Sequence, residues 1–260
     1  MITITFLNIK GGVGKTTTSV NIAAGLVDKG KRVLFIDYDK QGDSSDYFPS
    51  SSEVTIGDVL LDIIPIEQAM FKAEDNLYVI PSAMDIKDVE VKFNRDEKGA
   101  RHDVLKNSLD RIQNNFDYCI IDCHPDMNIL IANAIFASDK LIITIKPTAN
   151  GVKGFQNTLD NIEMLRTNLG ISIDPYVLFT IVSRINTEKS VMETIRKIIP
   201  DKVFDTQIRY QIGPIAKAED RKELVIRYSI PLIPNVSRDM RNTVDEILRR
   251  FENGKKKYGG

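Results

Sequence analysis

A glycine-rich segment near the N-terminus constrains this chain more than any other feature. It is Lys-Gly-Gly-Val-Gly-Lys-Thr-Thr over residues 10–17, directly after an apolar run of strand length and directly before a segment of helical period. Glycines let backbone N–H groups wrap around phosphate oxygens, and the N-terminus of a helix adds positive potential. The segment predicts a phosphate-binding loop. Its expected contacts are Gly11, Gly12, Val13, Gly14, Lys15, Thr16 and Thr17.

Two side chains of this loop have distinct predicted roles. Lys15 would neutralise the β- and γ-phosphates of a nucleotide, because a lysine at this place in the loop reaches those groups. Thr16 would ligate Mg²⁺ through its hydroxyl, since that ion prefers oxygen ligands and keeps most of its waters. The loop therefore predicts ATP and Mg²⁺ as cofactors.

Carboxylates follow two of the apolar runs that we expect to be strands. The run from Val33 continues into Asp37 and Asp39, and the run from Tyr118 ends in Asp122. In a doubly wound sheet ligands lie outside the carboxyl ends of the strands, so Asp37 and Asp39 should open beside the phosphate loop. Two acids in one place need a cation, and we expect Asp37 to support the Mg²⁺ shell.

Apolar runs of strand length alternate with longer segments of helical period along the chain. This alternation predicts an α/β fold, a doubly wound and mostly parallel sheet with helices on both faces. The expected strands are Thr3–Asn8, Arg32–Asp37, Leu77–Pro81, Tyr118–Asp122, Lys140–Ile145, Tyr176–Ile181 and Val203–Thr206. The expected helices are Thr16–Lys29, Thr55–Leu61, Arg101–Asn114, Gly151–Asn168, Ser190–Ile199 and Arg238–Phe251. No linker interrupts the series, which predicts one domain over residues 1–252 and a polar tail over 253–260.

Composition indicates a globular protein. The chain is 42% hydrophobic and 27% charged, which is unlike a disordered or fibrous chain. Its start has no basic, apolar leader, and no apolar run approaches the roughly 18 residues of a membrane span. Cys119 and Cys123 fall in one short segment, which does not indicate a disulfide framework. We therefore expect a cytoplasmic protein whose cysteines are buried or loop thiols.

The phosphate loop has one lysine more than an ordinary Walker A motif, at Lys10. With it, the loop resembles those of the deviant Walker A ATPases, a P-loop NTPase group that includes ParA/Soj partition proteins and MinD. The resemblance implies a homodimer that forms on ATP binding, in which Lys10 reaches across to the other subunit's phosphates. It also implies hydrolysis of Mg-ATP to ADP and phosphate. Lys10, Lys15 and Asp39 would be catalytic, with Asp39 orienting the attacking water, and Asp122 would contact Mg²⁺ through water.

Further segments resemble the ParA/Soj branch in particular. They are residues 55–61, 76–82 and 201–208, together with the short switch that begins at Asp37. The likeness implies a protein that coats DNA non-specifically, and so lies on the nucleoid, when ATP is bound. It would drive plasmid or chromosome partitioning, with a ParB-like centromere-binding protein stimulating hydrolysis and release.

The chain departs from the family pattern at several switch positions. Lys40 stands where the family has Pro, and Asp43 where it has Asn. In the second switch His124 and Asp126 replace a Pro and a Ser. These departures bear on turnover and on the geometry of the two switches.

DNA contact in the family pattern uses arginines at two places. Arg184 matches the first, whereas Gly213 occupies the second. The resemblance therefore implies contact through Arg184 and through nearby basic residues. These are Arg209, Lys217, Arg221 and Lys222. Net charge does not decide whether the chain binds DNA. Residues 151–260 contain 19 Lys and Arg against 14 Asp and Glu, which is a modest excess of positive charge.

A MinD-like, membrane-associated positioning ATPase is the alternative function. An amphipathic C-terminal helix would be its anchor, with Val244, Ile247, Leu248 and Phe251 on the apolar side. The same spacing is what a final helix packed on the sheet requires. We therefore expect no membrane association.

Overall fold

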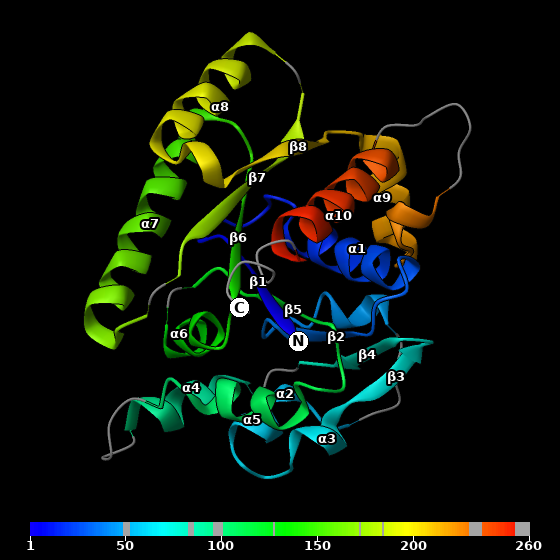
Figure 1. Ribbon diagram of the computed structural model, residues 1–260, viewed down its shortest axis with the longest axis vertical. Coiled ribbons are helices and arrows are strands. Elements are labelled where there is room, and N and C mark those ends of the chain that lie inside the picture. Colours follow the sequence, from blue (N-terminus) through cyan, green and yellow to red (C-terminus); the bar gives the residue numbers. More distant parts are fainter. Residues whose placement is uncertain are drawn as a thin grey trace, which may run out of the picture.

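The apolar runs of the sequence form strands that join one continuous sheet (Figure 1). The computed structural model describes residues 1–48, 53–82, 86–95, 101–126, 128–171, 173–183, 185–228 and 236–252. Within these residues the sheet has eight strands in the order β3-β4-β2-β5-β1-β6-β7-β8. The strands are β1 Ile2–Leu7, β2 Val33–Tyr38, β3 Phe71–Glu74, β4 Leu77–Ile80, β5 Tyr118–Cys123, β6 Lys140–Ile145, β7 Pro175–Val182 and β8 Val203–Arg209.

The direction of the strands confirms the predicted fold class. Neighbouring strands in the described part of the chain run parallel, except that β3 pairs antiparallel with β4. Every strand expected from the sequence is present, and β3 is an additional edge strand. The predicted strand Val203–Thr206 continues to Arg209.

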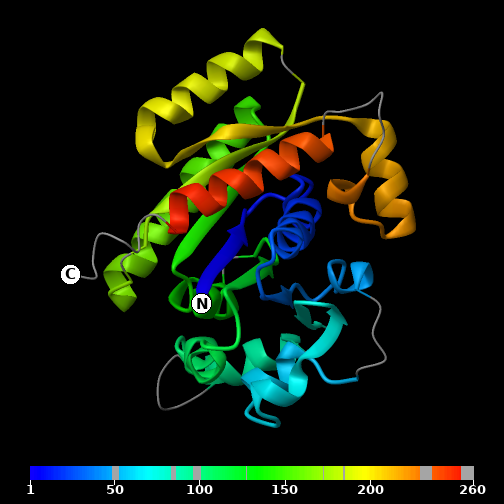
Figure 2. The ribbon, with the colours of Figure 1, turned by 45° about the vertical axis from the view of Figure 1, so that its right-hand side comes forward.

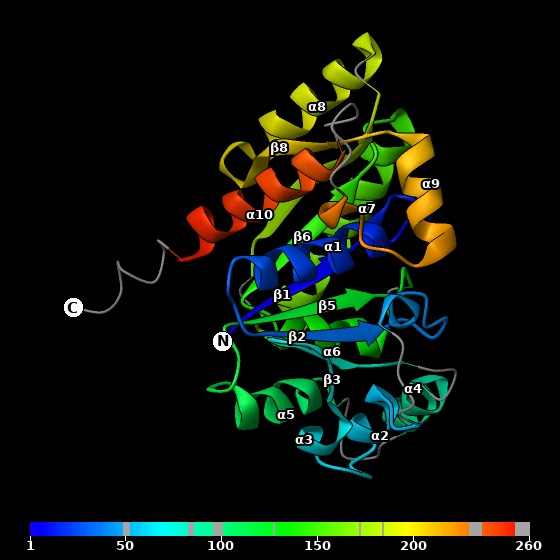
Figure 3. The same cartoon turned by 90° about the vertical axis from the view of Figure 1, so that its right-hand side faces the viewer.

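Helices cover both faces of the sheet. They are α1 Lys15–Asp28, α2 Ile56–Leu60, α3 Ile66–Ala69, α4 Ile86–Arg95, α5 Val104–Ile112, α6 Ile129–Phe136, α7 Ala149–Leu169, α8 Asn186–Ile198, α9 Ile212–Arg221 and α10 Val236–Glu252. Figure 3 shows α1 and α10 lying side by side on one face, and α5 and α6 on the other. In Figure 2 the orange α9 lies on the same side as α1 and α10. The single domain over 1–252 stays a prediction, and the tail 253–260 lies outside the described residues.

Side chains of β2 show why this strand is apolar from Val33 to Ile36. Leu34 and Ile36 belong to the core under α5 and α6, whereas Val33 and Phe35 belong to the core under α1 and α10. Successive side chains of a strand point to opposite faces, so a sheet covered on both faces needs apolar residues at every position.

The apolar face of α10 packs against the sheet. Val244, Ile247 and Phe251 are buried, and Leu248 is partly buried against the same core. This packing removes the observation that favoured a membrane anchor, because the same side chains are not available to lipid. None of the described helices is long and apolar enough to cross a membrane.

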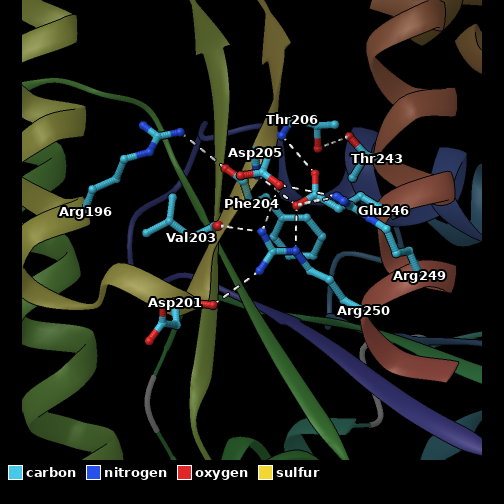
Figure 4. A network of polar contacts seen from close by, with 10 residues as sticks. All are labelled: Arg196, Asp201, Val203, Phe204, Asp205, Thr206, Thr243, Glu246, Arg249 and Arg250. Carbon is cyan, nitrogen blue, oxygen red and sulfur yellow. Dashed lines mark hydrogen bonds and ion pairs between the residues drawn. The ribbon is translucent and has the colours of Figure 1, made fainter. Parts of the chain in front are cut away.

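Polar contacts join α10 to the edge strand β8 (Figure 4). The pairing of β8 with β7 is irregular, and the N–H groups of Asp205 and Thr206 donate instead to the Glu246 carboxylate at 2.8 and 2.9 Å. Arg250 donates to the same carboxylate at 2.6 Å and to the Val203 carbonyl at 3.1 Å. Unpaired edge groups invite pairing with another chain, so these contacts also protect the edge.

Candidate nucleotide-binding site

A cavity of about 710 Å³ opens at the carboxyl ends of β1, β2, β5, β7 and β8. Ligands of open α/β sheets bind at this edge. The cavity wall includes residues 10–18, 39–41, 125, 126, 180, 181 and 208–211. The glycine-rich loop and the switch that follows β2 therefore face one space, as the sequence predicts.

The glycines of the loop adopt a backbone that other residues rarely take. Gly12 has φ of 71° and Gly14 has φ of 75°, both in the left-handed region. Gly14 is also the residue from which α1 begins, without a side-chain cap on the helix. The first N–H groups of α1 are therefore left at the cavity, where a phosphate would accept from them.

Two side chains outside the predicted set hold this loop in place. Asn8 accepts from the Lys10 N–H at 2.7 Å and donates to the Thr144 carbonyl oxygen in β6. The Thr180 hydroxyl of β7 donates to the Val13 carbonyl at 2.6 Å. Asn8 follows the last residue of β1 and lies two residues before Lys10, so its position was a usable signal. No local pattern marks Thr180, which meets the loop only through the sheet.

Lys15 and Asp122 form a buried ion pair beneath the loop. The Lys15 ammonium lies 2.8 Å from Asp122 Oδ1, and the two side chains are 10% and 1% exposed. Burial alone would lower the pKa of Lys15, but the charge and hydrogen bond of Asp122 outweigh it and raise that pKa. The ammonium is therefore charged at neutral pH, as a phosphate ligand must be.

Asp37 and Asp122 are direct neighbours on β2 and β5. Asp37 Oδ2 accepts from the Ser45 N–H at 2.8 Å and the Ser45 hydroxyl at 2.6 Å, and Oδ1 accepts from the Asp39 N–H at 3.1 Å. Burial raises the pKa of Asp37 to about 6, and the hydrogen bonds from Ser45 oppose that shift. Through these hydrogen bonds Asp37 holds the loop that follows β2. Its support of Mg²⁺ stays a prediction.

The donor set fits a hydrated Mg²⁺. Asp122 Oδ2 is buried and has no hydrogen-bond partner among the described residues, which is unusual for a carboxylate oxygen. Thr16 lies in the first turn of α1 and lines the cavity. A threonine hydroxyl with an unpartnered carboxylate oxygen suits an ion that binds through oxygen and retains water. No cluster of three or more His, Cys, Asp or Glu suited to a metal occurs in the described ranges.

Asp39 lines the cavity from the loop after β2. Its Oδ1 accepts from the Gln41 N–H at 3.0 Å, so the carboxylate shapes the loop while the side chain stays partly exposed. His124, which directly follows β5, is buried, and its Nδ1 accepts from the Asp126 N–H at 3.0 Å. Burial lowers the pKa of His124. Cys119 and Cys123 are buried free thiols, as predicted.

The far end of the cavity is formed by the end of β8. The Arg209 guanidinium makes two 2.8 Å hydrogen bonds to the carboxylate of Asp239, which is buried at the start of α10. Tyr210 is 51% exposed beside it. The pairing directs Arg209 into the cavity wall, so the structure adds no support for its predicted contact with DNA.

The remaining predicted DNA contacts lie on or beside α9. Lys217, Arg221 and Lys222 are exposed. Lys222 pairs with Asp46 at 3.1 Å and lies over the Tyr47 ring. The other predicted contact, Arg184, lies outside the described residues.

Comparison with known proteins agrees with this geometry. A protein-family model described as an AAA domain matches residues 1–174 of this chain. The sporulation initiation inhibitor protein Soj of Bacillus subtilis is 34% identical over 233 residues, covering 86% of this chain and 90% of Soj. The chromosome partitioning protein ParA of Caulobacter vibrioides is 32% identical over 209 residues, covering 77% of this chain and 78% of ParA.

Solved structures show the same fold. Apo McdA of Cyanothece has a TM-score of 0.83 at 23% identity, covering 95% of this chain and 99% of McdA. A cobyrinic acid a,c-diamide synthase of Mycobacterium smegmatis, with a bound ATP analogue and magnesium, has a TM-score of 0.81 at 23% identity. The match covers 98% of this chain and 97% of the synthase chain. Together with the sequence relatives, these findings show that the chain belongs to the ParA/Soj family of partitioning ATPases, within the P-loop NTPase fold.

Proposed function

We propose that this chain hydrolyses Mg-ATP as a homodimer that binds DNA non-specifically in its ATP state. The observation that carries the proposal is the cavity lined by the glycine-rich loop and Thr16, with the Lys15–Asp122 pair beneath it. The relatives named Soj and ParA support a partitioning role. The cargo would be a plasmid or chromosome, and the partner a ParB-like centromere-binding protein. We propose residues 1–252 as a single domain that acts in the cytoplasm.

The chemistry divides among a few side chains of the cavity. Lys15 would move from Asp122 Oδ1 to the β- and γ-phosphates, since both are anionic partners for one ammonium. Bound Mg²⁺ would supply further positive charge at the same phosphates, held by Thr16 and, through water, by Asp122. Asp39 would orient the attacking water. Positioning and charge stabilisation, rather than covalent catalysis, account for phosphoryl transfer of this kind.

DNA binding is assigned to the basic residues on and beside α9, together with Arg184. Lys217 and Arg221 are exposed, and neither forms an ion pair with other residues in the described segments. Such side chains meet phosphates rather than base edges, so binding would be independent of sequence. A dimer would present this surface twice.

Co-sedimentation with plasmid DNA tests the proposal. ATP-bound protein should bind DNA of unrelated sequences, with log affinity falling by about 0.9 per decade of salt for each phosphate neutralised. Arg184→Ala should make that slope shallower by roughly one to two units in a dimer, and Lys217→Ala with Arg221→Ala should do the same. Lys106→Ala on α5, which removes an exposed lysine elsewhere, is the control. Binding to anionic liposomes without binding to DNA at low salt would contradict the partition function.

A further inference from the structure

An ion pair joins the two loops that flank the phosphate end of the cavity. Lys40 follows β2 and Asp126 follows β5, and Lys40 Nζ lies 3.1 Å from Asp126 Oδ2. Both residues line the cavity that also contains the glycine-rich loop. The strands that carry them are neighbours in the sheet, so residues 86 positions apart in sequence meet across the opening.

Each loop is otherwise held by contacts within itself or with its own strand. The Asp39 N–H donates to Asp37, and the Gln41 N–H donates to Asp39. In the second loop the Asp126 N–H donates to His124. Among the described residues, the Lys40–Asp126 pair is therefore the one hydrogen bond or ion pair that joins residues 39–43 to residues 124–126.

The exposure of the pair indicates an effect on loop position rather than on folding. The Lys40 side chain is 34% exposed and that of Asp126 is 63% exposed, so water screens their attraction. Pairs this exposed add little to the stability of a fold. Lys40 is nevertheless the residue after Asp39 in the chain. A restraint on the Lys40 side chain therefore limits where the Asp39 carboxylate can lie.

The sequence departures at these positions match each other chemically. A proline at position 40 would restrict the backbone through its ring, and lysine gives no such restriction. Lysine there and aspartate at position 126 supply opposite charges that meet, where the family pattern has Pro and Ser.

We propose that Lys40 and Asp126 are positioning residues, an ionic clamp that fixes the two switch loops around the phosphates and holds Asp39 for hydrolysis. This inference rests on the proposed ATPase function of the cavity. Neither residue takes part in bond making, so the clamp should affect turnover more than nucleotide binding.

The experiment is steady-state ATP hydrolysis by Lys40→Ala, Asp126→Ala, the double variant and the reversed pair Lys40→Asp with Asp126→Lys. Each single variant should lower kcat by about three- to tenfold with a smaller change in KM, because small misplacements of a catalytic group slow the reaction. The double variant should be no slower than either single variant, and the reversed pair should recover most of the loss. Rising salt should slow the wild type toward the single variants, which should themselves respond less.

Lys106→Ala is the matched control, because it removes a similarly exposed ion pair, with Asp110 on α5 away from the cavity. It should leave kcat and the salt response unchanged, and melting temperatures should show that all variants fold. Equal kcat in wild type and both single variants, additive losses in the double variant, or no recovery in the reversed pair would overturn the clamp. If the wild type itself fails to bind and hydrolyse ATP, the proposed function fails instead.

Discussion

At the scale of single residues, the Lys15–Asp122 pair serves both the fold and the site. Lys15→Ala should abolish ATP binding, because the phosphates lose their fixed counter-cation. It should also destabilise the nucleotide-free protein by about 3 kcal/mol, since Asp122 is left charged and buried without a partner. Urea unfolding and binding of a fluorescent ATP analogue would measure the two effects.

A second substitution separates these effects. Lys15→Ala with Asp122→Asn should regain much of the lost stability, because the buried charge is gone, and should still fail to bind ATP. Near-normal ATP affinity in either variant would show that the loop does not use Lys15. A double variant as unstable as the single one would show that the buried carboxylate is not the cause.

Asp39 has a contact that complicates its predicted role, because Oδ1 also accepts the Gln41 N–H. Asp39→Ala should leave Mg-ATP bound, stop hydrolysis and trap the ATP dimer, since the group that orients the water is lost. Asp39→Asn keeps an acceptor for Gln41 but removes the charge. It should be equally inactive in a phosphate-release assay, and full turnover by this variant would assign Asp39 to loop shape alone.

Local sequence predicted the placement of some residues at the cavity, and it could not predict the placement of those that the order of the strands brings there. The loop from Gly11 to Thr17 carries its own geometry in its glycines, and the strand-end acids follow from apolar runs. The Lys40–Asp126 contact depends on β2 lying beside β5, which no local pattern reveals. Thr180 and Arg209 reach the cavity for the same reason, from strands on the other side of β1.

At the scale of secondary structure, α10 holds the edge strand β8 through Glu246 (Figure 4). The Glu246 side chain is 2% exposed and accepts from two backbone N–H groups and from Arg250. Glu246→Ala should lower the free energy of unfolding by about 2–4 kcal/mol, because buried donors and an arginine lose their acceptor. Urea titration would measure the loss.

Asp245 on the same helix provides the matched control. Its carboxylate pairs with Lys29, with side chains 56% and 44% exposed. Asp245→Ala should cost at most about 1 kcal/mol, as exposed pairs do. Equal losses in the two variants would mean that Glu246 does not brace β8.

The sequence did not predict α3, α4, α6, α9 or β3, and the residues of three of these show why or where a signal lay. The α6 segment is Ile-Leu-Ile-Ala-Asn-Ala-Ile-Phe and is buried on nearly every side, so it shows no helical period. The edge strand β3 has only four residues, two of them exposed, which leaves little pattern to detect. In contrast, α4 has Ile86, Val89 and Phe93 buried at helical spacing, so its sequence did contain a usable signal.

At the scale of the whole molecule, the position of Lys10 bears on assembly. Lys10 is exposed at the cavity, and its N–H is held by Asn8 at 2.7 Å. A side chain that is exposed beside a phosphate site is suited to reach the phosphates of a second copy. A second cation at a water-excluded interface would stabilise the charge that develops during phosphoryl transfer.

Lys10→Ala should therefore spare ATP binding by the monomer and remove both ATP-induced dimerisation and hydrolysis. Sedimentation velocity with and without ATP would measure the assembly, and equilibrium binding of a fluorescent ATP analogue would measure the affinity. Lys15→Ala is the contrast, because it should lose the nucleotide and so the dimer as well. An ATP dimer that persists in Lys10→Ala would show that the lysine acts within its own subunit. Loss of ATP binding by the Lys10→Ala monomer would lead to the same conclusion.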